Sequence, residues 1–214
     1  MKRFTALSRA ARALLLAAIP AATVAAAASG PFGFRVDQQN TDVLGGGARS
    51  ISALGPIGQE FSPSLTSLTD VVLYTKDFAP HNGAGATLTV RIHERTIDGP
   101  VLGESDPVHL HDNFSGATHF RFQPISVLPT GVYVIEVLAQ GDNWAAVSSM
   151  DHYGLGRTIV LGDPIANEDL IFMEGTRAGG DALPGAEEPA AAAQFQQASS
   201  IEETSWSRVK SLYR

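Results

Sequence analysis

The stretch Gly141-Asp-Asn-Trp-Ala145 contains residues well suited to recognise a ligand. The flat ring of Trp144 could stack on a sugar while Asp142 and Asn143 hydrogen-bond to its hydroxyls, and Tyr153 would add a second aromatic platform. The alternative is that Trp144 packs against the core edge and that its polar neighbours serve the turn. The sequence therefore predicts a ligand-binding site at Asp142, Asn143, Trp144 and Tyr153, with this alternative open.

Carboxylates near expected strand ends suggest a second chemistry, calcium binding. Ca²⁺ prefers oxygen ligands, which aspartates and loop carbonyls supply. Asp37 and Asp169 are the candidate metal ligands, and Asp42, Asp163 and Glu168 hold comparable positions. No known calcium-loop motif is present, so ordinary solvated carboxylates are the alternative. Ca²⁺ is the one cofactor that the sequence suggests.

Histidines offer a weaker metal signal. His109 and His111 are two residues apart, so in a strand they share a face and could bind one metal ion. His93 and His119 could join them only if their strands were neighbours. No third ligand is fixed by spacing, and exposed histidines on a polar face are the alternative.

Motifs for catalysis are missing from the sequence. His93-Glu94 lacks the second histidine of the zinc-protease pattern, and neither a nucleophile elbow nor a phosphate loop occurs. Paired carboxylates of a glycosidase have no sequence spacing rule, which leaves Glu94, Glu104, Glu136 and Asp142 as candidates. We expect a protein that is not an enzyme, with a small polysaccharide-acting hydrolase as an alternative.

The elements that must position these residues are strands. In residues 85–94, Leu88, Val90 and Ile92 alternate with polar residues, which is the period of a half-buried strand. Short strands of this kind, separated by Gly, Pro and Asn, recur from Phe32 to Gly175. They predict an all-β fold, an antiparallel jelly-roll-type β-sandwich.

Composition narrows the class of protein. The chain has 15 basic and 22 acidic residues and a net charge of -7, so we expect no nucleic-acid partner. It has no cysteine, which excludes disulfides and thiolate metal sites. The 214 residues suffice for one full core.

The N-terminus resembles a secretory signal peptide. Basic residues precede the apolar run Ala13–Val24, and small residues follow it up to Ala28. An uncleaved anchor is the alternative, but the run is short for a membrane span and contains Pro20. We expect cleavage after Ala28 and a mature chain, outside the cell or in the periplasm, that does not span the membrane.

The C-terminal region differs in composition from the β region. Residues 176–199 are rich in Ala, Gly, Pro and Gln and predict a flexible linker. Residues 200–214 begin with a capping box and place Trp206, Val209 and Tyr213 at helical spacing. The expected organisation is a signal peptide (1–28), a β-sandwich (29–175), a linker (176–199) and a short C-terminal amphipathic helix (200–214).

Several segments of the β region occur in a familiar order. They include Leu88-Thr-Val-Arg-Ile92, Gly99-Pro-Val-Leu-Gly103, Tyr133-Val-Ile-Glu-Val137 and Gly141-Asp-Asn-Trp144. Together they resemble secreted bacterial β-sandwich proteins, similar to jelly-roll carbohydrate-binding modules, that often carry a C-terminal sorting signal. The resemblance covers roughly residues 32–175 and implies the fold, but no binding residue. The Pro-Glu-Pro signal and transmembrane helix of the usual sorting tail are missing from this sequence.

These observations predict a secreted, non-catalytic binding module whose ligand is an extracellular or cell-surface carbohydrate. The first alternative is a structural envelope or matrix protein whose C-terminal tail docks to a sorting or surface partner. A helix that folds back on the sandwich is the other interpretation of that tail.

Overall fold

A computed structural model describes residues 33–42, 46–150 and 153–177 of the chain. Apart from the short helix α1 (Ile51–Leu54), the regular elements of this part of the chain are strands. The strands are β1 (Arg35–Asn40), β2 (Ala48–Ser50), β3 (Ile57–Phe61), β4 (Ser67–Asp77), β5 (Ala86–Glu94), β6 (Val101–Glu104), β7 (Val108–Leu110), β8 (Ser115–Ser126), β9 (Tyr133–Gly141), β10 (Trp144–Met150), β11 (Thr158–Val160), β12 (Asp163–Pro164), β13 (Glu168–Leu170) and β14 (Phe172–Thr176).

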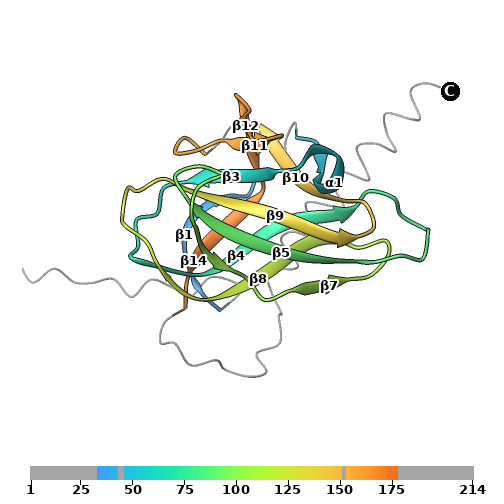
Figure 1. Ribbon diagram of the computed structural model, residues 1–214, viewed down its shortest axis with the longest axis horizontal. Helices are drawn as coiled ribbons and strands as arrows, with labels where there is room; N and C mark the ends of the chain where they lie inside the picture. Colours follow the sequence, from blue (N-terminus) through green and yellow to red (C-terminus); the bar gives the residue numbers. More distant parts are fainter. Residues whose placement is uncertain (1–32, 43–45, 151–152, 178–214) are drawn as a thin grey trace, which may run out of the picture.

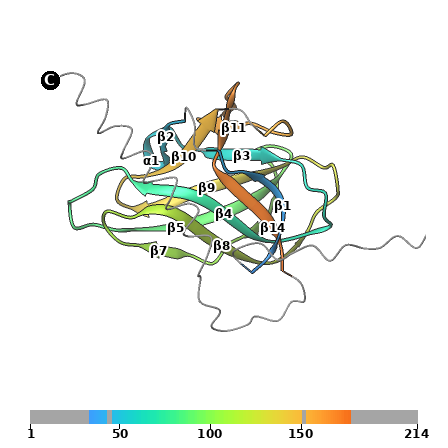
Figure 2. The ribbon, with the colours of Figure 1, turned by 180° about the vertical axis from the view of Figure 1, so that it is seen from behind.

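The strands form two antiparallel sheets that pack face to face. Sheet 1 has the order β1-β14-β4-β10-β13, with β2 beside β10 and β8 beside β4. Sheet 2 has the order β12-β11-β3-β9-β5-β6, with β7 beside β5. Figure 1 views the molecule from the side of sheet 2, and Figure 2 from the side of sheet 1. The predicted all-β antiparallel sandwich is confirmed.

Alternation of side chains along each strand builds the core. In β5, Leu88, Val90 and Ile92 are buried between the sheets, and the polar residues between them face outward. Sheet 1 contributes the inward side chains Leu73 and Phe172, which belong to the same apolar cluster. Burial of one such side chain stabilises the fold by about 1.5–3 kcal/mol before entropy costs.

Several element bounds differ from the sequence-based expectation. The alternation in residues 119–122 predicts only a short strand there, but β8 is twelve residues long, because the residues on both sides also pair with β4. Helix α1 was not expected, since four residues carry no detectable helical period. The β region extends to Thr176, one residue past the predicted boundary. The predicted signal peptide and C-terminal helix lie outside the described residues.

No helix within the described ranges is long and apolar enough to cross a membrane.

Candidate functional site at the loop end

Trp144 lies in the core, which corrects its predicted role. Its side chain is 0% exposed and belongs to the main apolar cluster, with its ring 6.1 Å from that of Phe114. A stacking platform needs an open ring face, and Trp144 has none. The indole N–H has no hydrogen-bond acceptor among the described residues. The alternative interpretation, a tryptophan at the core, therefore describes the structure.

Tyr153 is buried as well and cannot serve as the second platform. Its ring packs edge-on against Phe172 at 5.1 Å. Its hydroxyl accepts a hydrogen bond from Ser62 N–H (3.1 Å) and donates to Gln38 Oε1 (3.4 Å). Burial is the main cause that raises the pKa of Tyr153 to about 12, so its hydroxyl stays protonated.

Asp142 and Asn143 do lie at the surface, at one end of the sandwich. We call this region the loop end and define it by residues 78–85, 111–114 and 142–143, which connect β4 to β5, β7 to β8, and β9 to β10. Figure 1 shows these connections at the right-hand end of the molecule. The structure thus separates the two polar residues of the predicted site from its two aromatic residues.

Hydrogen bonds fix Asp142 and Asn143 to neighbouring segments. Asn82 Nδ2 donates to the Asp142 carboxylate across the loop end. Asn143 Oδ1 accepts from the hydroxyls of Ser50 (2.6 Å) and Ser52 (3.1 Å). Ser50 also caps α1, because its Oγ accepts from Ala53 N–H (3.2 Å). The loop that follows β9 is therefore tied to α1 and to residues 78–85.

Two further aspartates hold the backbone of the loop end in place. Asp77 Oδ1 accepts from Ala79 N–H (2.8 Å), and its Oδ2 accepts from Asn113 N–H (2.9 Å). Asp112 accepts from the N–H groups of His81 (3.0 Å) and Gly83 (2.9 Å). Desolvation acts to raise the pKa of Asp112, but these N–H groups and Asp77 outweigh it and lower that pKa. The two carboxylates thus hold residues 78–85 and 111–114, which are distant in the sequence, together as one ordered surface.

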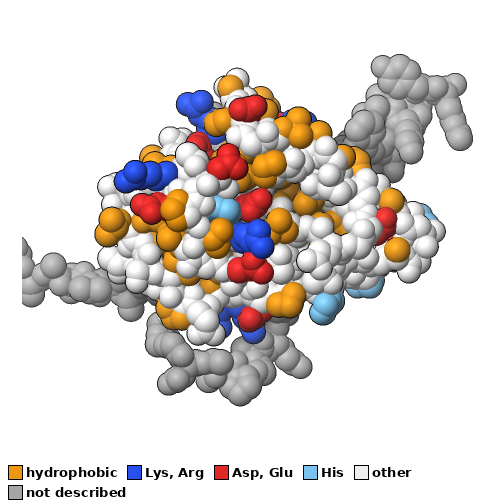
Figure 3. Space-filling view, viewed as in Figure 1, with side chains coloured by type: hydrophobic (Ala, Val, Ile, Leu, Met, Phe, Trp, Pro, Cys, Tyr) orange, Lys and Arg blue, Asp and Glu red, His pale blue; other side chains and the backbone are white. Residues whose placement is uncertain are grey.

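The exposed side chains of this surface include one aromatic ring. Phe78 is 46% exposed and directly follows β4, where its N–H donates to Asn143 C=O (3.0 Å). The exposed residues His81, Asn82 and His111 belong to the same loops. Figure 3 shows histidine and acidic side chains at this end of the molecule. An aromatic ring beside hydrogen-bonding groups is the combination that the sequence led us to expect around Trp144.

Sequence reasoning overlooked Phe78 and Asp112 as site residues. Phe78 is the first residue of a turn-rich segment that ends in His-Asn-Gly-Ala-Gly. No strand alternation assigns Phe78 to the core, and this signal could have marked it as a candidate for the surface. Asp112 gave no comparable signal, because its role depends on the pairing of β5 with β7.

The first predicted calcium ligand, Asp37, is already engaged by protein donors. Its Oδ2 accepts from the N–H groups of Ser64 (2.7 Å) and Leu65 (3.0 Å), and its Oδ1 accepts from the Ser64 hydroxyl. Glu174 faces it from β14 and is 1% exposed. Burial, the charge of Asp37 and a hydrogen bond to Asp37 raise the pKa of Glu174 to about 9. Glu174 is therefore a neutral acid near pH 7.

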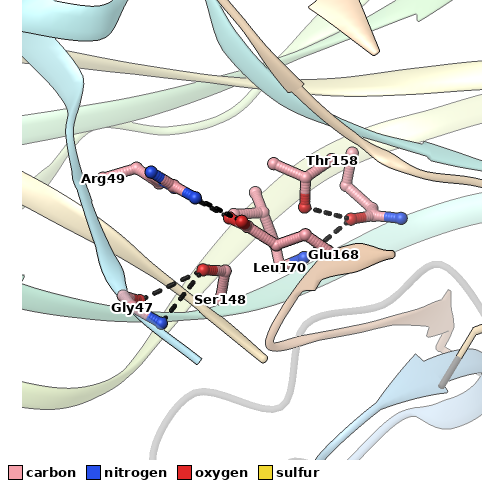
Figure 4. A network of polar contacts seen from close by, with 7 residues as sticks. Gly47, Arg49, Ser148, Thr158, Glu168 and Leu170 are labelled. Carbon is pink, nitrogen blue, oxygen red and sulfur yellow. Dashed lines mark hydrogen bonds and ion pairs between the residues drawn. The ribbon is translucent and has the colours of Figure 1, made fainter. Parts of the chain in front are cut away.

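The second predicted calcium ligand, Asp169, belongs to a buried network that links the two sheets. Its Oδ1 accepts from Gln59 Nε2 (2.9 Å), and its Oδ2 accepts from Tyr153 N–H (2.9 Å). Gln59 Oε1 accepts in turn from Leu170 N–H (2.7 Å) and from the Thr158 hydroxyl (3.3 Å). Figure 4 shows this region, in which β3 and β11 of sheet 2 approach β13 of sheet 1.

Arg49 neutralises a third carboxylate from the calcium hypothesis. The guanidinium of Arg49 donates to both carboxylate oxygens of Glu168, and Arg49 Nε lies 2.8 Å from Glu168 Oε1. Figure 4 shows this pair. Within residues 33–42, 46–150 and 153–177, no three His, Cys, Asp or Glu side chains are grouped to hold a metal ion. Asp37 and Asp169 thus act as hydrogen-bond acceptors in the structure, and calcium binding stays a prediction.

The predicted histidine sites do not converge. His93 lies on β5 in sheet 2 and His119 on β8 in sheet 1, so the sandwich separates them. His109 Nδ1 is 2.8 Å from the Thr87 hydroxyl, and His111 packs edge-on against Phe114. The pair His109 and His111 therefore has no third ligand within the described residues.

The glutamates considered for catalysis lie in ion pairs on sheet 2. Glu104 pairs with Arg91 at 2.6 Å, and Glu136 lies 2.8 Å from His93 Nε2. Glu94 is 3.8 Å from Arg95. Figure 3 shows charged and histidine side chains gathered at the centre of this face. Each of these glutamates lies beside a basic side chain.

Comparison with known proteins does not assign the chain to a family. No family model matches the chain, and no curated protein is significantly similar to it.

Proposed function

We propose that this protein is a secreted, non-catalytic binding module that recognises carbohydrate through its loop end. The observation that carries the proposal is the exposed ring of Phe78, which is set among loops held by Asp77, Asp112 and Asp142. Sugars present a C–H face and hydroxyl edges, and an aromatic ring beside amides and carboxylates matches both. The sugar site is thus moved from Trp144 to Phe78.

The ordering of the loop end favours binding. Its three segments are fixed by side-chain and backbone hydrogen bonds before any ligand arrives, so little conformational entropy is lost when a ligand binds. Loops carried on a rigid sandwich are also the usual place for recognition residues. The loop end therefore suits a rigid surface that reads the shape and hydroxyl pattern of a glycan.

Burial argues against the hydrolase alternative at Asp37 and Glu174, two carboxyls that face each other. Glu174 opposes Asp37 inside the sandwich and is almost fully sealed from solvent. A substrate could not reach it without opening the sheet edge. The resemblance to secreted bacterial sandwich proteins and the signal-peptide pattern in residues 1–28 support export, and hence a role outside the cell.

A glycan array with the mature chain, residues 29–214, tests the function. The expected result is binding to a defined set of glycans by the wild type and its loss in Phe78→Ala. Each sample is run with Ca²⁺ and with a chelator, because a bound calcium would make the signal depend on the ion. A folded wild-type chain without a reproducible glycan signal would contradict the proposal.

A further inference from the structure

Sheet 1 carries a second apolar cluster on the face turned away from sheet 2. We call it the outer cluster, and it consists of Phe34, Val72, Tyr74, Ile171 and Met173. Val72 lies between Val71 and Leu73 on β4, and both of these neighbours belong to the core. Because successive side chains of a strand point to opposite faces, the outer cluster faces away from the core.

The outer cluster is as well buried as the core. Its side chains are only 1–5% exposed. The solvent face of a two-sheet sandwich normally carries polar, half-exposed residues, as Thr87, Thr89 and Arg91 do on sheet 2. Among the described residues no strand or helix packs over this face of sheet 1. A further segment of chain must therefore cover it.

Arg177 shows that the chain leaves β14 beside this cluster. Its N–H donates to Thr69 Oγ1 (2.8 Å), and its guanidinium donates to both oxygens of Asp70 (2.6 and 3.1 Å). Asp70 shares the outer face of β4 with Val72, about 7 Å further along the strand. His119 Nε2 lies 2.7 Å from the same carboxylate. The ion pair thus places Arg177, the last described residue, at the outer face of sheet 1.

The sequence after Arg177 contains a segment of matching chemistry. Residues 200–214 place Trp206, Val209 and Tyr213 on one side of an expected helix, with Leu212 beside them. Residues 178–199 form the expected linker, and a flexible chain of that length spans roughly 25 Å. This reach is several times the distance from Asp70 to Val72, so the segment can return to the cluster. The expected signal peptide is removed and cannot be the cover of the mature protein.

We propose that residues 200–214 of the same chain dock with their apolar side on the outer cluster. Docking would bury Trp206, Val209 and Tyr213 against Val72, Tyr74 and Met173, and leave the basic residues of the segment in solvent. The tail then folds back onto the sandwich and is not free to serve as a sorting signal.

Methionine oxidation in the intact mature chain tests this docking. Met173 belongs to the outer cluster, whereas Met150 is exposed on β10, and peroxide oxidises accessible methionines faster. In a Trp206→Asp, Val209→Asp chain, we expect Met173 to be oxidised several-fold faster than in the wild type. Met150, the internal control, should be oxidised at the same rate in both chains. An unchanged Met173 rate in the double variant would overturn the proposal.

The fluorescence of Trp206 provides an independent measurement. Trp144 is buried, so subtracting the spectrum of Trp206→Phe from that of the wild type isolates Trp206 without disturbing the core. We expect emission shifted to the blue and several-fold less quenching by iodide than in a free peptide of residues 200–214. Quenching equal to that of the peptide would contradict docking. Protection that disappears on dilution, together with a dimer in light scattering, would assign the cover to a second copy and also overturn the proposal.

Discussion

Asp169 and Asp112 are both aspartates whose two carboxylate oxygens accept hydrogen bonds from the protein, but their surroundings differ. Asp169 lies between the sheets and binds Gln59 and Tyr153, whereas Asp112 lies at the loop end and binds two loop N–H groups. Trp144 and Phe78 form a parallel contrast, one sealed in the core and one open to solvent. The same residue types thus stabilise the interior of the sandwich and shape a binding surface at its end.

This contrast gives a rule for interpreting substitutions. A change in the interior should alter the free energy of unfolding and leave the binding surface intact as long as the chain folds. A change at the loop end should alter ligand binding with little effect on unfolding.

The largest effect is expected for Trp144→Ala. Removal of this buried ring leaves a cavity in the main core, so the free energy of unfolding should fall by about 3–5 kcal/mol. Chemical denaturation measures the loss, and Trp144→Phe should lose less because most of the volume remains. A loss below about 1 kcal/mol, typical of surface positions, would contradict the core assignment.

Glu174→Gln should stabilise the protein near neutral pH. The folded-state pKa of about 9 exceeds the ordinary value of 4.5, so between these pH values the folded chain holds a proton that the unfolded chain has released. Wild-type stability therefore falls as pH rises through this window, by about 1.4 kcal/mol per pH unit.

Glutamine is neutral at every pH, so the variant does not lose stability as pH rises through this window. The variant should gain about 3 kcal/mol at pH 7 and almost nothing at pH 4. Denaturation curves of both chains from pH 4 to 9 provide the measurement. A difference that does not change with pH would show that Glu174 ionises normally.

Gln59→Ala should be destabilising through the network that joins the sheets. It leaves an oxygen of Asp169 and the N–H of Leu170 without their partner in a buried site, which costs about 2 kcal/mol. Gln123→Ala, at an exposed position of β8, is the matched control and should be neutral. Equal effects of the two substitutions on unfolding would refute the importance of the network.

Asp112→Ala should weaken glycan binding several-fold with little loss of stability. The substitution frees the N–H groups of His81 and Gly83, so the loop must be ordered when the ligand binds. Asp106→Ala, an exposed aspartate outside the loop end, serves as the control for the removed charge. Titration calorimetry with a glycan identified on the array compares the affinities of the two variants. Equal affinities would argue against a role for the hydrogen bonds of Asp112 in binding.

Phe78→Ala should have the smallest effect on unfolding, within about 0.5 kcal/mol, because the ring is half exposed. Its effect on glycan affinity should nevertheless be the strongest of the series. Leu128→Ala removes another exposed apolar side chain, away from the loop end, and should change neither quantity. Parallel denaturation and titration of the two variants separate a binding role from a general loss of apolar surface.

The sequence predicts the fold better than the site. Alternation in residues such as Leu88, Val90 and Ile92 is local, so it identifies strands and their inward face without knowledge of their partners. The location of Trp144 depended on which side of β10 faces sheet 2, and the short run Trp144-Ala-Ala-Val147 does not reveal this. Asp112 and Asp169 act through partners that are distant in sequence, and only the paired strands bring them together.

The location of a bound glycan tests the account most directly. Hydrogen exchange of the mature chain, with and without a glycan identified on the array, reports which backbone segments the ligand protects. The account predicts new protection in residues 78–85, 111–114 and 142–143, with β5 and β9 unchanged. Protection confined to the outer face of sheet 2, around Arg91 and Glu136, would contradict it.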